Sequence, residues 1–453
     1  MTVALPDAGL WRRLARGERV ELPDPLPIPA GGRAAGRVEP PPSKSVSHRY
    51  LNLALLAGRP VRVERLLAAD DLDLFVAALR GCERSVRRAG EVVEIGAAGE
   101  ASRTDEPVRI DCGNAGTMFR FLTASLAAIP GRFVLDGSPR LRERPIAPLV
   151  AALRELGAEV SFLAVEGHAP LAIEGGTLVG GRCALDASQS SQYLSALLMA
   201  GARAAQPLEI VVTALRSDPY VDVTLAALAA FGLDLVRREG RSWRVRPATR
   251  QELAAGPSML RVEADYSAVA YPAAAAALTG GDVWIQGVER SSAQGDRIFL
   301  DVLAEMGAAV DWRGDALRVR GGRLRAVDVD FSSLPDQVPT LAALACFADG
   351  TTHIRNVAHL RWKESDRLGA VALEFRESGF SIEEAPDALR IVGRPTGADT
   401  RPVVVDSHDD HRIAMSLALV GLRRPGLAVA APGVVAKSYP GFWRDLATLL
   451  TPD

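Results

Sequence analysis

The chain has 453 residues, of which 48% are hydrophobic and 24% are charged, so it can bury a large core and is expected to form two or more domains. Its formal net charge of −2 argues against a general affinity for nucleic acid, so a positively charged site has to be local. The four cysteines are far apart and form no Cys-x-x-Cys motif, which fits a reducing compartment and no structural zinc. The sequence has no apolar run of about 18 residues and no signal-peptide pattern, so we expect a cytoplasmic protein that does not span a membrane.

Residues 1–25 are expected to be an extension of the folded core. They contain a short amphipathic segment at residues 10–14, and prolines follow at positions 23, 25, 27 and 29. This pattern is typical of an extension that docks only loosely on the rest of the protein.

A repeat begins after this extension. One half of it is an amphipathic helix that ends in glycine and leads into an apolar strand. The glycines are Gly81, Gly157, Gly232, Gly307 and Gly379, which by subtraction lie 76, 75, 75 and 72 residues apart. Each is expected to take the left-handed conformation that ends a helix. A sixth helix, at residues 442–450, falls where the next copy should end.

The other half of the repeat is a helix rich in alanine and leucine, followed by a turn and a strand. Its copies begin near Ser45, Gly116, Ser191, Ser267, Val338 and Arg412. Helices that are apolar all round are buried. The sequence therefore predicts a mixed α/β (α+β) protein made of six packed units of about 75 residues.

The segments that precede these buried helices carry more polar side chains than capping requires. They are residues 43–49, 112–120, 188–192, 263–267, 335–339 and 409–412. A helix N-terminus offers free N–H donors and roughly half a positive charge, so several of them together would bind phosphate or carboxylate groups. Residues 360–368 add three basic and two acidic residues between apolar flanks. A solvated helix face is one interpretation, but Lys363 and Arg367 have like charges at i,i+4 spacing, which favours an anion site.

Nine motifs along the chain, taken together, resemble one known family. They are Ser43-Lys-Ser-x-Ser-x-Arg49, Gly113-Asn-Ala-Gly-Thr117, Arg142-Glu-Arg-Pro-Ile146, Ser190-Ser-Gln192, Ser217-Asp-Pro-Tyr220, Pro335-Asp336, Arg361-x-Lys-Glu-Ser-Asp-Arg367, Asp410-His-Arg412 and Lys437-Ser-Tyr-Pro440. In this order they resemble the 5-enolpyruvylshikimate-3-phosphate synthases. The resemblance implies the enolpyruvyl transferase fold, with two domains of three βαβαββ-type units each that close over the substrates. The expected parts are the extension 1–25, one domain at 43–263, and a second domain made of 26–42 and 264–453.

The resemblance also implies a reaction. The enolpyruvyl group of phosphoenolpyruvate is transferred to the 5-hydroxyl of shikimate 3-phosphate through a tetrahedral intermediate, and phosphate is released. Addition needs a base at the hydroxyl and an acid at the methylene carbon, and elimination reverses these roles. By family position, Asp336 is the base, and Glu364 and Lys44 transfer protons at the methylene. Read alone, Asp336 could equally be a helix cap before Val338.

The binding residues that the resemblance implies fall into two sets. Those expected for shikimate 3-phosphate are Lys44, Ser45, Arg49, Ser190, Ser191, Gln192, Ser217, Tyr220, Asp336, His359 and Lys363. Those expected for phosphoenolpyruvate are Lys44, Asn114, Gly116, Arg144, Gln192, Arg367, Arg412 and Lys437. Arginine suits both anions because its planar guanidinium can bond bidentately. The chemistry calls for no metal and no cofactor, and the family suggests a monomer.

The chain departs from the family pattern at several positions. Residues 264–268 (Ala-Asp-Tyr-Ser-Ala) replace Gly-Asp-x-Ser-Ser at a domain crossing, which puts the hinge geometry in question. Asp218 stands beside the expected phosphate contact Ser217, where a basic residue is common. Pro42 replaces a glycine, and Phe121 replaces a proline of some members. Gly116 is the residue of glyphosate-sensitive members, so we expect sensitivity.

Two other functions stay open. A catalytically silent relative would bind shikimate 3-phosphate without turnover, and the departures at 264–268 and Asp218 allow it. The sister enolpyruvyl transferase that acts on UDP-N-acetylglucosamine typically carries Lys-Asn where this chain has Lys44-Ser45, and it has a loop cysteine near residues 142–145. This chain has no cysteine between Cys112 and Cys183, which argues against that enzyme.

Overall fold

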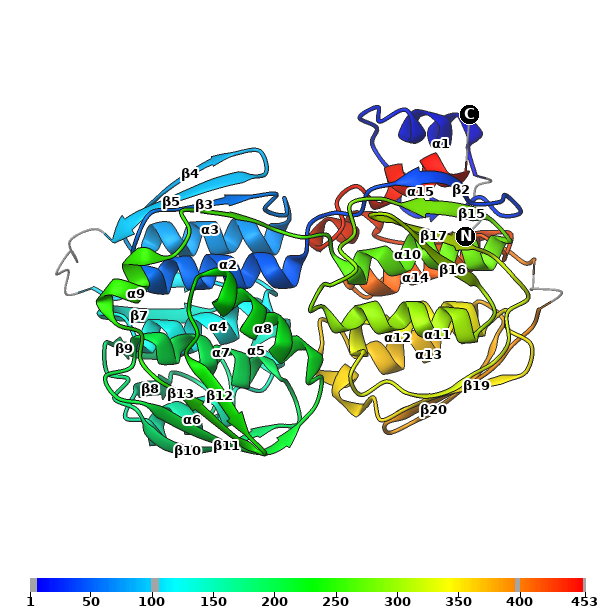
Figure 1. The fold of residues 1–453 in the computed structure, drawn as a ribbon. Helices are drawn as coiled ribbons and strands as arrows, with labels where there is room; N and C mark the ends of the chain where they lie inside the picture. The colour runs from blue at the N-terminus through cyan, green and yellow to red at the C-terminus, as the bar shows by residue number, and fades with distance from the viewer. Residues whose placement is uncertain (1–5, 99–105, 396–399, 451–453) are drawn as a thin grey trace. The chain divides into compact units, whose positions relative to one another are not determined.

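The computed structural model describes residues 6–98, 106–395 and 400–450, and the chain forms two compact units. The first unit comprises Met1–Pro41 and Glu263–Asp453, and the second unit comprises Pro42–Val262 (Figure 1). The chain passes to the second unit after Pro41 and returns at Glu263. The sequence placed these two passages near residues 42 and 263.

The second unit repeats one order of elements: strand, buried helix, parallel strand, second helix and antiparallel hairpin. Its elements are α2 (Lys44–Ala57), β3 (Val61–Glu64), α3 (Asp70–Gly81), β4 (Arg84–Ala89), β5 (Val92–Ala98), β6 (Val108–Asp111), α4 (Gly116–Ala127), β7 (Gly131–Asp136), α5 (Pro139–Glu143), α6 (Ala147–Glu155), β8 (Glu159–Phe162), β9 (Leu171–Gly175), β10 (Gly181–Ala187), α7 (Gln192–Ala200), η1 (Gly201–Arg203), β11 (Leu208–Leu215), α8 (Pro219–Ala230), β12 (Val236–Glu239), β13 (Ser242–Val245), α9 (Arg250–Ala255) and β14 (Met259–Arg261). Among its described residues the strands form three sheets, ordered β14-β3-β5-β4, β6-β7-β9-β8 and β10-β11-β13-β12. The first two strands of each sheet run parallel and the hairpin pairs antiparallel.

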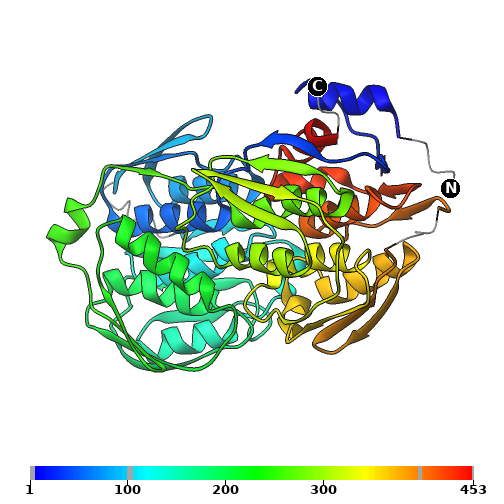
Figure 2. The same cartoon turned by 45° about the vertical axis from the view of Figure 1, so that its right-hand side comes forward.

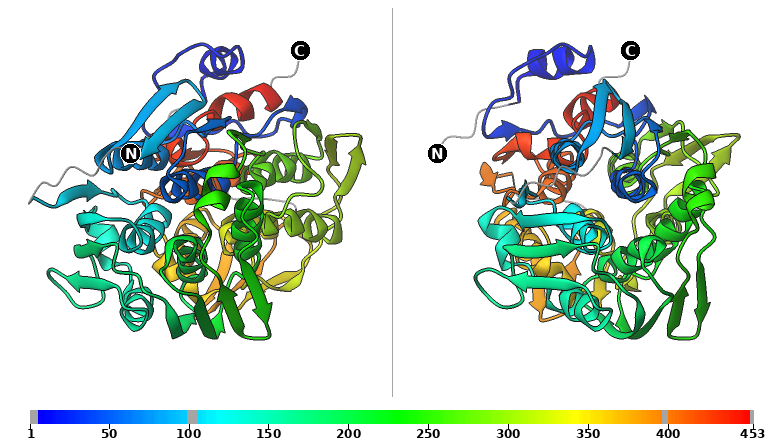
Figure 3. Two further views of the ribbon diagram at one scale, coloured as in Figure 1. Left: turned by 60° about the vertical axis from the view of Figure 1, so that its left-hand side comes forward. Right: turned by 90° about the vertical axis from the view of Figure 1, so that its left-hand side faces the viewer.

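Helices α2, α4 and α7 form the interior of the second unit, and almost every one of their side chains after the first turn is buried. The strands of this unit lie around its outside when it faces the viewer (Figure 3, right). Asn52 links two polar contacts inside this core: Ser125 Oγ donates to Asn52 Oδ1 (2.9 Å), and Asn52 Nδ2 lies 3.5 Å from Met199 Sδ. The N-termini of these three helices carry the polar motif segments that the sequence singled out.

The first unit uses the same order. Its elements are α1 (Ala8–Ala15), β1 (Leu26–Pro27), β2 (Ala35–Val38), α10 (Tyr266–Thr279), β15 (Asp282–Ile285), η2 (Gly295–Ile298), α11 (Phe299–Glu305), β16 (Ala309–Arg313), β17 (Ala316–Arg320), β18 (Asp328–Asp330), η3 (Pro335–Gln337), α12 (Val338–Ala345), β19 (Thr351–Arg355), η4 (Ala358–Trp362), α13 (Arg367–Glu377), β20 (Ser381–Ala385), β21 (Ala388–Val392), β22 (Val403–Val405), α14 (His411–Gly421), β23 (Leu427–Val429), η5 (Pro432–Lys437) and α15 (Phe442–Leu450). Its described strands form sheets ordered β16-β17-β15-β2, β18-β19-β21-β20 and β1-β23-β22. Helices α10, α12 and α14 pack on one another in the interior.

Two strands are paired far from their sequence neighbours. Strand β2 precedes α2 in the chain but pairs in parallel with β15, with Ala35 opposite Asp282. Strand β14 precedes α10 but pairs in parallel with β3, with Met259 opposite Arg62. Each unit thus completes one of its sheets with a strand that lies just before a passage of the chain to the other unit.

The N-terminal extension does not dock loosely, so this prediction is wrong. Helix α1 lies beside α15 (Figures 1 and 2). Trp11 is only 3% exposed, and its ring meets the edge of Trp443 with centroids 6.5 Å apart. The amphipathic pattern of residues 10–14 is therefore the pattern of a helix that completes the core of the first unit.

The prediction for the helix-ending glycines holds at four positions and is wrong at the first. Gly157, Gly232, Gly307 and Gly379 have φ of 86°, 77°, 110° and 90°. Helix α3 instead continues through Gly81, and the left-handed residue is Glu83, with φ of 57°.

The departure at residues 264–268 forms a capped helix start. Asp265 accepts hydrogen bonds from the backbone N–H groups of Ser267 (2.8 Å) and Ala268 (3.4 Å). Gln294 Nε2 donates to the carbonyl of Ala264 (2.7 Å), and the N–H of Asp265 donates to the carbonyl of Pro41 (2.9 Å). Because Asp265 supplies the cap, Ala264 and Ala268 can replace the glycine and the serine of the motif without loss of the helix start.

Across the described ranges, every helix is too short or too polar to cross a lipid bilayer.

Candidate active site

The first unit contains a buried network of charges centred on Arg367, the first residue of α13. Its guanidinium is 1% exposed and contacts three carboxylates: Nη1 to Asp336 Oδ1 (2.8 Å), Nη2 to Glu364 Oε2 (2.7 Å) and Nε to Asp410 Oδ2 (2.7 Å). Arg412 Nη2 reaches the other oxygen of Asp336 at 2.9 Å. We call these five residues the Arg367 network.

The local sequence explains this convergence. Asp336 lies in the short turn η3 that leads into α12. Asp410 caps α14 by accepting the N–H of Arg412 (3.0 Å), so Arg412 projects from the first turn of that helix. Each member of the Arg367 network therefore lies at or just before the start of a helix, where the N–H groups favour negative charge.

The charges around Asp336 fix its protonation state. Burial acts to raise the pKa of Asp336, but Arg412, Lys363 and Arg367 outweigh it and hold this pKa far below its ordinary value. Lys363 Nζ lies 3.6 Å from Asp336 Oδ1. For Arg367 the two effects have the opposite signs: burial acts to lower its pKa, but the carboxylates of Asp410, Glu364 and Asp336 outweigh burial and raise this pKa above its ordinary value. Asp336 is thus an ionised carboxylate held between cations.

The other candidates of the first unit lie on neighbouring elements. His359 is in η4 and Lys437 ends η5, and they are 6% and 8% exposed. Residues 360–368 do not form the single charged helix of the alternative interpretation, because η4 ends at Trp362 and α13 begins only at Arg367.

In the second unit, the start of α2 carries Lys44 and Arg49. Lys44 Nζ lies 3.2 Å from Asp71 Oδ2. Arg49 is 2% exposed, and it donates to Thr224 Oγ1 and to the carbonyls of Ser45 and Tyr220, each at 2.8 Å. Burial lowers the pKa of Arg49 to about 9. Arg49 therefore ties α2 to α8, and it acts on Ser45 and Tyr220 through their backbone.

Arg144 lies against the start of α4. A Cβ placed on Gly116 would come within 2.5 Å of Arg144 Cζ, so the guanidinium rests directly on the glycine. Arg144 is 4% exposed, and its Nη1 lies 3.4 Å from the carbonyl of Asn114. The structure thus brings together three of the residues expected to bind phosphoenolpyruvate.

Sequence reasoning missed Arg120, which orients Gln192. Arg120 Nη1 donates to Gln192 Oε1 (3.0 Å) and approaches the carbonyl of Gly116 (3.3 Å). Gln192 Nε2 in turn donates to Thr117 Oγ1 (2.9 Å). Arg120 is only 3% exposed, and a buried charge in an otherwise apolar helix is a signal that the sequence did offer.

The remaining candidates of the second unit lie at the starts of α7 and α8. Ser190 Oγ accepts the N–H of Gln192 (3.3 Å), and Ser191 is 4% exposed. Ser217 has a left-handed φ of 58° immediately before α8. Its neighbour Asp218 lies 3.6 Å from Arg238, so a cation faces the acid that departs from the family pattern.

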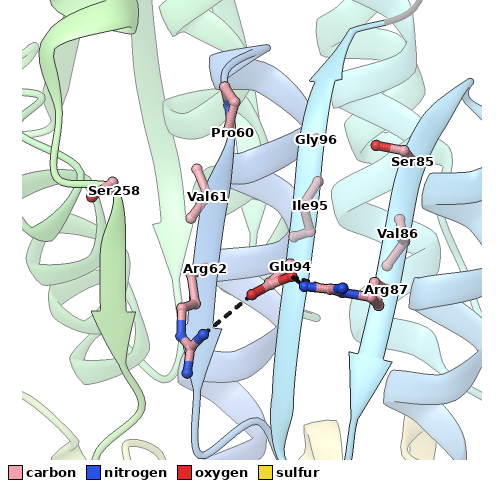
Figure 4. Close-up of a pocket in the computed structure, with 10 residues that line it drawn as sticks. All are labelled: Pro60, Val61, Arg62, Ser85, Val86, Arg87, Glu94, Ile95, Gly96 and Ser258. Carbon is pink, nitrogen blue, oxygen red and sulfur yellow. Dashed lines mark hydrogen bonds and ion pairs between the residues drawn. The ribbon is translucent and has the colours of Figure 1, made fainter.

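Three cavities of the second unit lie against its sheets. Their volumes are about 510, 580 and 550 Å³, and no candidate site residue is among the described residues that line them. Figure 4 shows the first, crossed by ion pairs from Glu94 to Arg62 (3.2 Å) and Arg87 (2.5 Å). Within the described ranges, no group of three or more His, Cys, Asp or Glu residues could hold a metal ion. The helix starts, with their buried arginines, remain the sites with the chemistry to bind small anions.

Six repeated α/β units, with buried arginines at several of their helix starts, form the enolpyruvyl transferase fold. An enolpyruvyl transferase of Streptomyces tendae, NikO, has this fold, with a TM-score of 0.75 at 21% identity over 94% of this chain and 98% of that one. Residues 28–446 match the family described as EPSP synthase (3-phosphoshikimate 1-carboxyvinyltransferase). The chain belongs to this family.

Relatives with curated names agree with this assignment. The 3-phosphoshikimate 1-carboxyvinyltransferase of Syntrophobacter fumaroxidans is 44% identical over 413 residues, which cover 90% of this chain and 96% of that protein. The enzyme of the same name from Aliivibrio salmonicida is 40% identical over 418 residues, covering 91% and 96%. The solved EPSP synthase of Acinetobacter baumannii has a TM-score of 0.73 at 27% identity, covering 92% of this chain and 96% of that one.

Proposed function

We propose that this protein transfers the enolpyruvyl group of phosphoenolpyruvate to the 5-hydroxyl of shikimate 3-phosphate and releases phosphate, a step of the shikimate pathway towards chorismate and the aromatic amino acids. One observation carries the proposal: the family match extends over residues 28–446 and includes both the Arg367 network and the starts of α2, α4 and α7. The sister enzyme that acts on UDP-N-acetylglucosamine is not favoured by these comparisons.

The proposed reaction has two stages. In the addition stage, Asp336 accepts the proton of the 5-hydroxyl, and the hydroxyl oxygen bonds to C2 of phosphoenolpyruvate. At the same stage, Glu364 or Lys44 delivers a proton to C3. In the elimination stage, the new methyl group returns a proton to Glu364 or Lys44, the bond from C2 to the phosphate oxygen breaks, and phosphate leaves with the proton that Asp336 accepted. Each group thus acts once as acid and once as base.

The paired state of Asp336 suggests how it becomes a base. While Arg412 and Arg367 hold it, its pKa is too low for it to accept a proton readily. The phosphate and carboxylate of phosphoenolpyruvate compete for the same guanidinium groups. When these groups turn to the substrate, the carboxylate loses part of its stabilisation, and its pKa rises towards the ordinary range.

The proposed ligands follow from the helix starts. Phosphoenolpyruvate would be bound by Lys44, Asn114, Gly116, Arg144, Gln192, Arg367, Arg412 and Lys437. Shikimate 3-phosphate would be bound by Lys44, Ser45, Arg49, Ser190, Ser191, Gln192, Ser217, Tyr220, Asp336, His359 and Lys363, and Arg49 also holds the backbone of Ser45 and Tyr220. These sets combine buried cations with hydroxyl and amide groups, as binding of a phosphorylated polyol and a small dianion requires.

Two further properties belong to the proposal. The four cysteines are free thiols, which supports a reducing, cytoplasmic location. One chain supplies all the proposed groups, which supports a monomer. Sedimentation of the purified protein at several concentrations tests this state, and a mass that doubles with concentration would contradict it.

The test is phosphate release from phosphoenolpyruvate, with and without shikimate 3-phosphate, for wild type and Asp336→Ala. We expect release only with both substrates, and its loss in the variant. Asp349→Ala is the matched control, because Asp349 pairs with the exposed Arg323. Release with UDP-N-acetylglucosamine instead would assign the sister activity. Tight binding of shikimate 3-phosphate without release would indicate the silent relative.

A further inference from the structure

The loop at residues 406–410, which carries Asp410 into the Arg367 network, is held by helix α13 at both of its ends. At one end, Arg367 Nε and Nη2 contact Asp410 at 2.7 and 3.3 Å. At the other end, Glu374 Oε2 accepts the N–H of Asp406 (2.9 Å), and Glu374 Oε1 lies 2.7 Å from His408 Nε2. We call the contacts of Glu374 with this loop the Glu374 clamp.

The spacing on α13 makes this two-point attachment possible. Arg367 and Glu374 are seven residues apart, which is about two helical turns, so both side chains leave the same face of the helix about 10 Å apart. A single rigid element thus fixes both ends of the loop.

Glu374 is placed for this role and for little else. It is 6% exposed, and both of its carboxylate oxygens are engaged by the loop. A carboxylate is kept in the interior of a protein only where hydrogen bonds or opposite charge compensate for its lost hydration. Within the part of the chain that the structure describes, the loop supplies the hydrogen bonds to both carboxylate oxygens, so the position of the acid and the position of the loop depend on each other.

The loop has a backbone that needs such support. His408 and Asp409 both have a left-handed φ of 52°. For residues with a Cβ this conformation costs about 1–2 kcal/mol each, and it persists only where surrounding contacts hold it. The N–H of His408 donates to Asp406 Oδ1 (2.7 Å), and the N–H of Asp410 donates to the carbonyl of Ser407 (2.9 Å). Without the clamp, this turn would have fewer contacts to keep Asp410 in place.

The loop positions Asp410, which contacts both arginines of the Arg367 network. Asp410 Oδ2 accepts hydrogen bonds from Arg367 Nε and from Ser365 Oγ (3.1 Å), and Asp410 Oδ1 accepts the N–H of Arg412. A displacement of Asp410 would therefore move both guanidinium groups that contact Asp336. We propose that Glu374 and His408 are positioning residues that set Arg367 and Arg412 for phosphoenolpyruvate. This inference rests on the function proposed above.

The test compares Glu374→Ala, His408→Ala and the double variant. We expect each single variant to raise KM for phosphoenolpyruvate by about 10- to 100-fold, because a displacement of about 1 Å can have that effect. KM for shikimate 3-phosphate should stay within about twofold, and the double variant should be no worse than the poorer single one, as expected for one shared contact. Glu374→Gln should restore much of the affinity, because its amide can accept the N–H of Asp406 and donate to a neutral His408.

Phe375→Leu is the control for stability. Phe375 is fully buried on the same helix, so its loss lowers the melting temperature without touching the clamp. An unchanged KM for phosphoenolpyruvate in Glu374→Ala would overturn the proposal. So would an equal rise of both KM values in Glu374→Ala and Phe375→Leu, since that describes a merely structural role.

A second measurement separates the clamp from the proposed reaction. The rise in melting temperature that phosphoenolpyruvate produces needs no turnover, and it should be smaller in Glu374→Ala than in wild type. If wild type releases no phosphate, the proposed function fails, and the thermal shift still decides on the clamp. If wild type turns over and the shift is equal in the two proteins, the clamp alone is refuted.

Discussion

Gly116→Ala is expected to damage phosphoenolpyruvate binding while leaving the fold intact. The added methyl group would lie 2.5 Å from both Cζ and Nη1 of Arg144 and 2.6 Å from its Nη2. Non-bonded carbon and nitrogen atoms need about 3.5 Å, so the guanidinium has to withdraw by roughly 1 Å. Arginine can bend away at its end, so the clash should be relieved by moving Arg144 and not by moving the helix.

The size of the effect follows from the contacts at stake. A hydrogen bond to a charged group contributes about 1.5–3 kcal/mol, and each 1.4 kcal/mol is a factor of ten in affinity. Loss of one such bond from Arg144 should raise KM for phosphoenolpyruvate roughly 10- to 100-fold. Alanine favours a helix over glycine by about 0.5–1 kcal/mol, which offsets part of the strain. The melting temperature should therefore change by only a few degrees.

The assay is steady-state phosphate release with each substrate varied in turn, together with thermal melting. Gly32→Ala is the matched control, because a Cβ there meets only Leu450 at an ordinary 3.9 Å. An unchanged KM for phosphoenolpyruvate in Gly116→Ala, or a large loss of stability, would refute the reasoning. Wild type is also expected to be inhibited by millimolar glyphosate, since Gly116 has no side chain that could crowd the inhibitor, and unaffected activity would contradict this.

Three further predictions concern buried side chains outside the Arg367 network. Burial lowers the pKa of His48 from 6.5 to about 4, so the imidazole is neutral in the folded state. The full free energy of unfolding is therefore present above pH 6.5, and about 3 kcal/mol of it should be lost as the pH falls through 4. Urea unfolding should show this loss for wild type but not for His48→Leu. Trp11→Ala should lower the free energy of unfolding by about 3–5 kcal/mol with unchanged KM values, and an unaltered melting curve would mean that α1 does not belong to the core. Arg120→Leu should raise KM for phosphoenolpyruvate about tenfold, because Gln192 loses the contact that orients it. Arg132→Leu, on an exposed strand, is the control, and equal KM values in the two variants would exclude a role of Arg120 in orienting Gln192.

The buried helices were predictable from the sequence because their signals are local. Helix α15 matches residues 442–450, and α4 and α12 begin at Gly116 and Val338, as the apolar runs indicated. A capping residue next to a long alanine- and leucine-rich run defines a helix start within a few positions. The prediction for Gly81 was wrong because the same local rule cannot tell whether a glycine follows the last helical residue or is itself the last residue of the helix, as it is in α3.

Strand pairing was beyond a local reading. Nothing in Met259–Arg261 indicates that it pairs with Val61–Glu64, about 200 residues earlier. Three-residue strands such as β14 have too few residues for their hydrophobic pattern to specify a partner strand. Their pairing is set instead by the unpaired edge of the sheet that they join. The repeat indicated the number of units, and the resemblance indicated which domain residues 26–42 join, but neither indicated the strands with which β2 and β14 pair.

The candidate site was predictable as a set of residue types, but not as an electrostatic arrangement. The sequence indicated concentrated positive charge at Lys363, Arg367 and Arg412, and residues of this kind alone would repel one another. In the structure, Asp336, Glu364 and Asp410 occupy the positions between them. The cations of this cluster are thus held together by its own carboxylates, and an incoming phosphate or carboxylate has to compete with them for the guanidinium groups. This competition links binding to catalysis, because the carboxylate that is displaced from the arginines is the one proposed to accept the substrate proton.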